Sequence, residues 1–510
     1  MEALRQSMER SRAARQQTEE GTHKERNGTQ LAFLILALTV AIGLSPAGEL
    51  AAYLYPTLTV AATAGLLARR RVDHALELNL WTWATAPAVR RLIDWSSGSF
   101  NESSPVLVTA SMSALLLAVS VLKPSRRVPL GFGLGFFAIL TAALFATVIG
   151  VRDNGWLPAA ISAILWIAPV MLGLVMLTAG EDLEARIEAV LRFSRWALLV
   201  LSTYAIVQWV LAPPWDNFWL SNAFPYATKL GSPFGQPEAF LIRPWSLFNS
   251  PFGFAHLLVW LLISQIGTAV RGRKVTYAGV VAGCLALGLT GIRSAWVTAA
   301  LTVAILAVYR QVRVTRFIAL LAATAIVTVT VFSPAAEEIS RRIGTAGSAA
   351  SDVSVLARIE KYNQALPPFL ADFFGAGMGS TGSGARANSQ SDLGFSFSLD
   401  SSYLEALRVN GSILGILIIS AVLLMSVAAF RRSRWRSPPL PAWGAMALVI
   451  PINMFLGGVL DGPQAVVTWI VIGTCGGAPG QIAKVDPHTR STPSRRGHLQ
   501  DELGTEATSA

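Results

Sequence analysis

Residues 412–430 read SILGILIISAVLLMSVAAF, and residues 316–332 read RFIALLAATAIVTVTVF. Apolar runs of roughly 20 residues match the hydrocarbon thickness of a lipid bilayer. The chain is 53% hydrophobic and 14% charged, whereas soluble domains contain about 25% charged residues. Comparable runs recur along almost the whole chain, at 31–46, 50–68, 105–122, 129–150, 156–178, 195–213, 251–270, 275–291, 294–309, 441–458 and 462–477. The sequence therefore predicts an all-α, polytopic helical membrane protein.

The basic residues lie mainly in short connections between the apolar runs and in the tails. The chain has 41 Lys and Arg against 30 Asp and Glu, a net charge of +11. Clusters such as RRR at 69–71, RGRK at 271–274, RQVRVTR at 310–316 and RRSRWR at 431–436 mark the cytoplasmic side by the positive-inside rule. The charge therefore indicates orientation in a membrane, and no nucleic-acid partner is expected.

The two tails constrain the number of membrane crossings. Both tails are polar, and we expect both in the cytoplasm, which requires an even number of crossings. The apolar runs are odd in number, and the amphipathic segment HALELNLWTWATAPAVRRLIDW at 74–95 either lies along the interface or enters the membrane. We predict about 12 transmembrane helices.

The predicted organisation has five parts. A cytoplasmic tail at 1–30 precedes transmembrane helices at 31–332, which include an outer loop at 214–250. A large extracytoplasmic loop of short helices at 333–410 is followed by C-terminal transmembrane helices at 411–480 and a disordered cytoplasmic tail at 481–510. A loop as long as 333–410 between two spans is commonly functional, so we expect it to cap an active site on the outer face.

Three arginines are predicted on this outer face. Residues 275–309 are apolar between two basic clusters, so they must cross the membrane twice and turn between Thr290 and Arg293. The same topology places Arg243 and Arg358 outside. The planar guanidinium binds phosphate oxygens in a bidentate manner, so these arginines suit a lipid diphosphate headgroup. The alternative is that each arginine pairs with a local carboxylate or reaches lipid phosphate.

Acidic residues before the span at 412–430 are candidate general bases. Asp400 and Glu405 lie in the stretch DSSYLE. The structural interpretation is a capping box between Ser402 and Glu405, with Asp400 complementing the helix dipole. The functional interpretation is that Asp400 or Glu405 accepts a proton from an attacking hydroxyl. Asp461, at an outer boundary, is a further candidate because intramembrane carboxylates are commonly functional.

Two segments of the large loop have structural interpretations. Ser351-Asp352 precedes a predicted amphipathic helix that ends at Pro367-Pro368. We expect one face of this helix to lie on the membrane surface, with the apolar residues Val355, Ile359, Tyr362 and Leu366. The run GAGMGSTGSGA at 375–385 lacks the preceding strand and GK[ST] of a nucleotide loop. It predicts a flexible lid or a close backbone approach.

The histidines and cysteines give little support for metal chemistry. No histidine pair has metal-ligand spacing, and the two cysteines, Cys284 and Cys475, lie in separate apolar runs. His256, near the outer end of a span, either packs through a hydrogen bond or takes part in catalysis. We therefore expect no metal site and no cofactor.

Four stretches form a series of motifs along the second half of the chain. RPWSLFNSPFGFAHLL (243–258) is an arginine motif that enters a span, and LTGIRSAWVTAAL (289–301) forms a hairpin turn with an arginine. ARIEKYNQALPPFLADFFGAGMGS (357–380) is an arginine helix followed by Pro-x-x-Gly-x-Gly, and DSSYLEALRVNGSILGILI (400–418) precedes the next span. In order and spacing, these motifs resemble those of the O-antigen ligase and polysaccharide polymerase superfamily of membrane glycosyltransferases. The resemblance covers about half of the chain.

The resemblance implies a metal-independent transfer of glycan from a polyprenyl-diphosphate donor on the extracytoplasmic face of the cell membrane. It implies that Arg293 and Arg358 bind the donor diphosphate with help from Arg243, and that the acceptor is a glycan or a lipid. Ligases of the family often have a histidine at the start of the last motif, where this chain has Asp400-Ser401. This difference favours the polymerase or exopolysaccharide-assembly branch.

Two other classes of protein fit the same composition. A flippase or secondary transporter for lipid-linked oligosaccharides would show inverted repeats and ionisable groups in mid-membrane, whereas the charges here concentrate in the outer loop. A membrane scaffold of a cell-wall assembly is the third possibility. Release of free lipid diphosphate would distinguish an enzyme from both.

Overall fold

The computed structural model describes residues 28–45, 48–101, 104–122, 128–223, 233–266, 274–309, 353–386, 399 and 401–478. Within these ranges the elements are helices without strands, and a single β-bridge joins Gly235 to Ile242. In this part of the chain, 6 helices are long and apolar enough to cross a membrane: α3 (Gly48–Ala68), Pro105–Leu122, α6 (Leu130–Asp153), α7 (Trp156–Leu177), Gly180–Leu211 and α17 (Ser402–Ser433). The all-helical membrane fold is confirmed at this level, and the number of spans stays a prediction.

The remaining helices are shorter or more polar. The segment Gly180–Leu211 contains α8 (Leu183–Leu211), and Pro105–Leu122 contains α5 (Thr109–Leu117). The others are α2 (Gly28–Gly43), α4 (Val72–Ser97), α9 (Pro214–Ala223), α10 (Pro251–Ile266), α11 (Lys274–Thr290), α12 (Arg293–Val308), α15 (Val353–Ala371), α16 (Gly382–Arg386), α18 (Leu440–Leu456) and α19 (Gly462–Gly477). The predicted apolar run at 316–332 lies outside the described residues.

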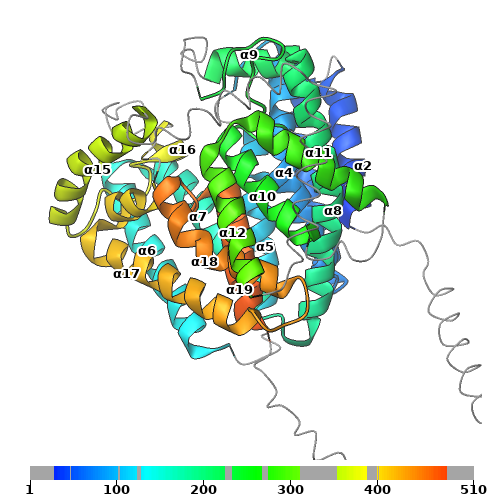
Figure 1. The fold of residues 1–510 in the computed structure, drawn as a ribbon. Helices are drawn as coiled ribbons and strands as arrows, with labels where there is room; N and C mark the ends of the chain where they lie inside the picture. Colours follow the sequence, from blue (N-terminus) through cyan, green and yellow to red (C-terminus); the bar gives the residue numbers. More distant parts are fainter. Residues whose placement is uncertain are drawn as a thin grey trace, which may run out of the picture. The chain divides into compact units, whose positions relative to one another are not determined.

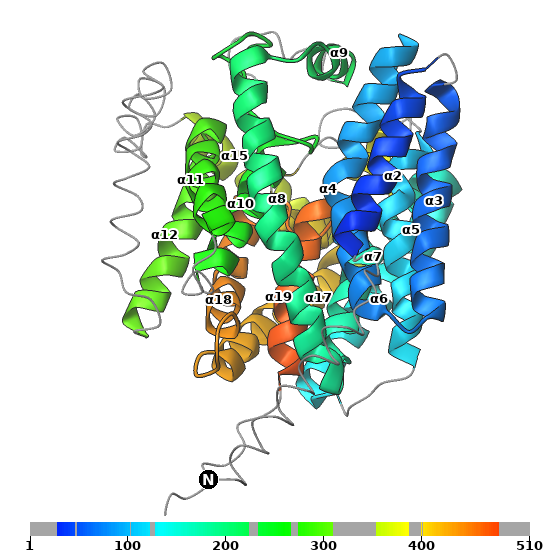
Figure 2. The same ribbon diagram turned by 90° about the vertical axis from the view of Figure 1, so that its right-hand side faces the viewer.

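The amphipathic segment at 74–95 forms most of α4, which packs inside the bundle. Helices α2, α3 and α5 lie beside it (Figure 2), and α8 contacts it as well. Its tryptophans Trp81 and Trp83 are buried, and so are its charged residues Glu77 and Arg91. Of the two predicted alternatives, burial among apolar helices favours a helix that enters the membrane.

Helices α7 and α19 pack backbone against backbone at the centre of the molecule. A Cβ added at Gly473 would lie 2.0 Å from the carbonyl oxygen of Gly173, so only glycine permits this approach. The ring of Trp469 lies 5.5 Å from that of Phe136 on α6, centroid to centroid. Small residues let membrane helices approach closely, and here they fix the position of α19, whose first turn follows Asp461.

Side-chain contacts define two ends of the helix bundle. At the first, which we call the Asp461 end, the amide of Gln464 accepts from the N–H of Gly253 on α10 (3.2 Å) and donates to the carbonyl of Gly458 (3.2 Å). At the opposite end, which we call the Arg432 end, Arg432 donates to the carbonyl of Ala478 at 2.9 Å. The N-termini of α10 and α19 therefore lie at the Asp461 end, and the C-termini of α17 and α19 lie at the Arg432 end.

The predicted turn between two spans is present, but the two helices do not form a packed hairpin. Helix α11 ends at Thr290, Gly291 takes a left-handed φ of 64°, and α12 begins at Arg293. From this turn α11 packs against α8 and α10, whereas α12 packs against α18 and α10. The sequence predicts the break in the chain and not the partners of each helix.

Helix α15 continues beyond its predicted end. Pro367 and Pro368 lie inside the helix, which ends at Ala371. The buried side chains of Ala365 and Phe369 lie on either side of the prolines and pack on α17. Tertiary packing can hold a helix through proline, so the prediction that the helix stops at Pro367-Pro368 is wrong. Figure 1 shows α15 beside α17 and α16 beside α7.

Candidate functional site

The connection between α18 and α19 is fastened to the first turn of α17. The Ser402 hydroxyl accepts from the N–H of Val459 at 2.7 Å and donates to the carbonyl of Gly457 at 3.2 Å. The backbone N–H of Ser402 donates to the same Gly457 carbonyl at 3.1 Å. These three bonds hold the segment that leads to Asp461 against α17, one turn from Glu405.

Ser401, rather than Ser402, caps α17. The Ser401 hydroxyl accepts from the N–H of Leu404 at 3.5 Å and donates to the carbonyl of Met454 at 3.1 Å. The predicted capping box between Ser402 and Glu405 is therefore wrong, because the Ser402 hydroxyl is engaged with the α18–α19 connection. The backbone N–H of Ser402, which Glu405 would accept from in such a box, donates instead to the carbonyl of Gly457.

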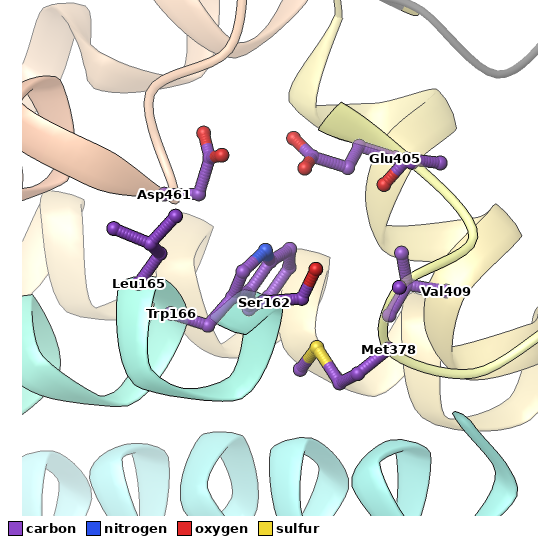
Figure 3. A pocket seen from close by; sticks show the side chains of 9 residues that line it. Ser162, Leu165, Trp166, Met378, Glu405, Val409 and Asp461 are labelled. Carbon is purple, nitrogen blue, oxygen red and sulfur yellow. The ribbon is translucent and has the colours of Figure 1, made fainter. Parts of the chain in front are cut away.

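Glu405 and Asp461 face each other across a small cavity at the Asp461 end (Figure 3). A Cβ added at Gly458 would lie 3.6 Å from Oδ1 of Asp461 and 4.0 Å from Oε2 of Glu405, so the two carboxylates share one space. The cavity has a volume of about 10 Å³, which is close to the minimum for one water molecule. Its walls are formed by Ser162, Leu165, Trp166, Met378, Gly379, Thr381, Glu405, Val409 and Asp461.

The carboxylates differ in their surroundings. Glu405 is buried and lines the cavity together with Trp166, which is also buried. Asp461 precedes α19 in the α18–α19 connection and is partly exposed. The low-polarity surroundings raise the pKa of the Asp461 carboxyl to about 6. Two carboxylates in one buried space resist carrying two charges, so the pair can hold a proton and accept another.

One wall of the cavity belongs to residues 375–379, which we call the glycine strap. Met378 and Gly379 of this strap line the cavity. Gly375, Gly377 and Gly379 have φ values of 76°, 74° and 88°, in the left-handed region. The N–H of Met378 donates to the carbonyl of Ala146 on α6 at 2.8 Å. The Asn154 amide donates to the carbonyl of Ala376 at 2.7 Å. Of the two predicted alternatives, the close backbone approach is confirmed, because this run is clamped against α6.

The three predicted diphosphate-binding arginines all lie at the Asp461 end, but none of them lines this cavity. Arg243 lies in the segment before α10, where its N–H donates to the carbonyl of Phe234 at 2.8 Å. Arg293 is the first residue of α12. Thr298, on the next turn of the helix, donates to Oδ1 of Asn453, near the end of α18. Arg243 is assigned to the Asp461 end because the start of α10 contacts Gln464 there. Arg293 is assigned to it because α12 contacts the end of α18.

Arg358 lies one turn before Tyr362 on α15. The Tyr362 hydroxyl bonds to that of Ser401, the cap of α17. The ring of Tyr362 lies 5.1 Å from that of Phe455, at the end of α18. Arg358 is therefore on the side of α15 that faces the ends of α17 and α18. The other predicted base, Asp400, lies outside the described residues.

A second cavity lies between α10, α12, α18 and α19. Its volume is about 30 Å³, and its polar lining consists of His256, Thr298, Asn453, Gln464 and Thr468. Nδ1 of His256 lies 3.0 Å from the carbonyl oxygen of Phe252, and Nε2 has no hydrogen-bond partner. A neutral imidazole that donates from Nδ1 presents Nε2 as an acceptor. His256 thus both packs and offers a polar atom to this cavity.

Sequence reasoning missed most of the lining of the carboxylate cavity. Trp166 and Ser162 lie inside an apolar run, and nothing in the spacing of that run distinguishes them. Glu405 was predicted as a candidate base and Asp461 as a boundary carboxylate, but their pairing depends on the path of the α18–α19 connection. Among the described residues, no group of 3 or more His, Cys, Asp or Glu side chains could hold a metal ion.

Comparison with known proteins adds no family assignment. The chain matches no model of a known protein family, and it has no significant match among curated proteins.

Proposed function

We propose that this chain is a membrane glycosyltransferase that polymerises or ligates polyprenyl-diphosphate-linked oligosaccharides on the extracytoplasmic face. The observation that carries the proposal is the pairing of Glu405 and Asp461 in one cavity. The pair lies at the same end of the bundle as the segments that carry Arg243, Arg293 and Arg358. A proton acceptor and a set of phosphate-binding cations on one face are the two requirements of such a transfer.

The proposed reaction is a direct displacement at the anomeric carbon of the donor glycan. A hydroxyl oxygen of the acceptor forms the new bond to this carbon, and the bond from the carbon to the diphosphate oxygen breaks. The electron pair leaves with the polyprenyl diphosphate, whose growing charge is stabilised by Arg243, Arg293 and Arg358. The hydroxyl proton passes to Asp461, which faces Glu405 and whose pKa is raised to about 6 by burial. Asp400 stays an alternative base.

The orientation follows from the positions of the basic clusters. The clusters at 69–71 and 431–436 adjoin the ends of α3 and α17 that lie away from Asp461. By the positive-inside rule, these positions support an orientation with the Asp461 end outside the cytoplasm. Counting α4 together with the 13 apolar runs of the sequence gives 14 crossings, which is more than the predicted 12 but even, as two cytoplasmic tails require. The cell membrane is the proposed location, with membrane lipids around the spans.

A reconstituted reaction tests the proposal against a transporter. The purified chain in liposomes would be given a polyprenyl-diphosphate oligosaccharide and an oligosaccharide acceptor. We expect free polyprenyl diphosphate and a lengthened glycan to appear together. Movement of the intact lipid across the bilayer without diphosphate release would identify a flippase instead.

The assignment of the donor arginines has its own test in cells. Arg293→Ala removes a cation at the proposed diphosphate site, so we expect loss of long polymer with an unchanged amount of protein. Arg152→Ala is the matched control, because Arg152 is exposed at the same end and its ion pair with Asp153 lies on the surface. Full-length glycan from Arg293→Ala would show that Arg293 does not bind the donor.

A further inference from the structure

The outer helix α15 and the residues just after it expose a row of large apolar side chains. The exposed fractions are 51% for Leu356, 49% for Ile359, 43% for Leu370, 61% for Phe373 and 64% for Phe374. Leu356, Ile359 and Leu370 fall within one quarter of the helix circumference, since each residue turns the helix by about 100°. The exposed Asn363 lies within the same edge, and Phe373 and Phe374 extend its apolar part beyond the helix end. Exposed apolar side chains grouped in this way are typical of an interaction surface.

This exposed edge is separate from the side of α15 that packs on the protein. Ala365 and Phe369 are buried against Leu404 and Leu407 of α17, and Tyr362 and Leu366 are partly buried in the same cluster. The predicted membrane-facing set is therefore divided, because Tyr362 and Leu366 contact α17 and only Ile359 among its described side chains is exposed. The exposed edge adjoins this packed side.

A third side of α15 is polar. Glu360 and Gln364 are exposed, and the Gln364 amide donates to Oε1 of Glu360 at 3.0 Å. The helix thus presents one side to the protein, one apolar edge outward and one polar side away from both. A helix with this division of its surface is typical of segments that lie in the plane of a membrane interface.

The apolar edge is continuous with the lipid-facing surface of a membrane helix. The ring of Phe374 lies 6.4 Å from that of Phe145 on α6. Along α6 the apolar residues Phe137, Leu144 and Val148 are 69%, 59% and 71% exposed, as expected where a span meets lipid. Phe374 therefore lies where the lipid-facing surface of α6 reaches the Asp461 end.

We propose that α15 is an in-plane helix whose exposed edge, with Phe373 and Phe374, is embedded in the acyl region of the outer leaflet. Its polar side, with Glu360 and Gln364, faces water. This arrangement sets Arg358, on the packed side, at the depth of the lipid headgroups. The occupant of the surface is thus the bilayer itself, and the inference stands whether or not the chain is a glycosyltransferase.

Depth measurement by spin labelling tests this placement without any assay of activity. Cys284 and Cys475 would be replaced by alanine, and single cysteines introduced as Leu370→Cys or Phe373→Cys. The matched controls on the polar side are Glu360→Cys and Gln364→Cys. Each labelled protein in lipid nanodiscs would be exposed to oxygen, which concentrates in the acyl region, and to a water-soluble nickel chelate.

We expect the labels at 370 and 373 to collide with oxygen at least threefold more often than with the chelate, and the control labels to show the reverse. Chelate access to all four labels would place α15 in water and overturn the proposal. Protection of 370 and 373 from both reagents would also overturn it, because another protein surface, such as a second copy or residues 310–352, would then cover the edge. Variants that elute with the profile of the unlabelled protein qualify for the comparison.

Discussion

Asp461 differs in its surroundings from the other carboxylates at the Asp461 end. It is held in a connection fixed by Ser402, and it faces Glu405 rather than a cation. Burial raises its pKa to about 6, which is close to the range in which a general base works best. By contrast, the exposed Asp153 pairs with Arg152, which lowers the pKa of the Asp153 carboxyl.

The pKa of Asp461 predicts a pH dependence for glycan transfer. The group must be ionised to accept a proton, so the rate should rise with pH up to about 6 and level off above it. Below this value the rate should fall about tenfold per pH unit. Initial rates of diphosphate release between about pH 4.5 and about pH 8, a range that extends more than one pH unit below and above this pKa, would check this. A flat profile, with the protein folded throughout, would exclude Asp461 as the base.

Gly377, like Gly375, leaves no room for a side chain in the strap. Its φ is 74°, and an added Cβ would lie 2.3 Å from the backbone nitrogen of Gly150. Gly377→Ala combines left-handed backbone strain of about 1–2 kcal/mol with overpacking of about 1–3 kcal/mol. We expect a clear loss of thermal stability in detergent.

Gly131→Ala serves as the control for this change. An added Cβ at Gly131 on α6 has no atom within 4 Å. Its unfolding temperature should be unchanged or slightly raised. Equal behaviour of the two variants would show that the strap is not clamped as described.

At the scale of elements, a buried ion pair joins α4 to α9. Nε of Arg91 lies 2.8 Å from Oδ1 of Asp216, and both side chains are fully buried. Asp216 also accepts from Tyr204 at 2.8 Å and from Gln208 at 2.7 Å on α8. Arg91 donates to the carbonyl of Ser246 at 2.7 Å. The network fixes the segment that follows Arg243 to the ends of α4 and α8.

Removing one partner of this pair should destabilise the bundle strongly. Arg91→Met leaves Asp216 buried without its cation, which costs about 3–5 kcal/mol. The double variant Arg91→Met with Asp216→Leu should be more stable than either single variant, because no buried charge is left over. Thermal unfolding in detergent measures both. Arg152→Met, in the exposed pair with Asp153, should cause no measurable change, and a similar loss there would contradict this reasoning.

The elements themselves were largely predictable, whereas their polar contacts were not. Apolar runs predict membrane helices from length alone, and the break at Gly291 follows from two basic clusters. Segment 74–95 was ambiguous because Glu77 and Arg91 look unsuited to a membrane interior. Their partners, Arg192 and Asp216, are distant in sequence. The capping residue of α17 was predicted wrongly for the same reason: the partners of Ser402, Gly457 and Val459, are more than 50 residues away in sequence.

At the scale of the whole molecule, the contacts separate two faces. The candidate site, the glycine strap and α9 belong to the Asp461 end. Arg186 donates to the carbonyl of Val175, and Arg192 lies 3.3 Å from Glu77, both away from that end. Sequence reasoning predicted this division through the positive-inside rule. The approach of Asp461 to Glu405 could not be predicted from the sequence. It depends on the packing of α19 on α7, and the glycines that allow this packing are not distinguished from the rest of their apolar runs.

Labelling from one side of the membrane tests this division. Asp153→Cys lies at the Asp461 end, and Ser437→Cys lies after α17 near the Arg432 end; both positions are exposed. A membrane-impermeant maleimide added to right-side-out vesicles should label Asp153→Cys at once. Ser437→Cys should react only after the membrane is opened. Labelling of both from the same side would contradict the proposed orientation.

The most direct measurement is the rate of polyprenyl diphosphate release by purified Asp461→Asn, compared with Asp153→Asn and the unaltered chain. Asparagine has nearly the shape of aspartate but does not accept the proton, so we expect Asp461→Asn to be slower by roughly 100-fold or more. Asp153→Asn should release diphosphate at the rate of the unaltered chain, since its carboxylate is exposed and outside the cavity. Release by Asp461→Asn at the unaltered rate would contradict a reaction centred on the Glu405–Asp461 pair.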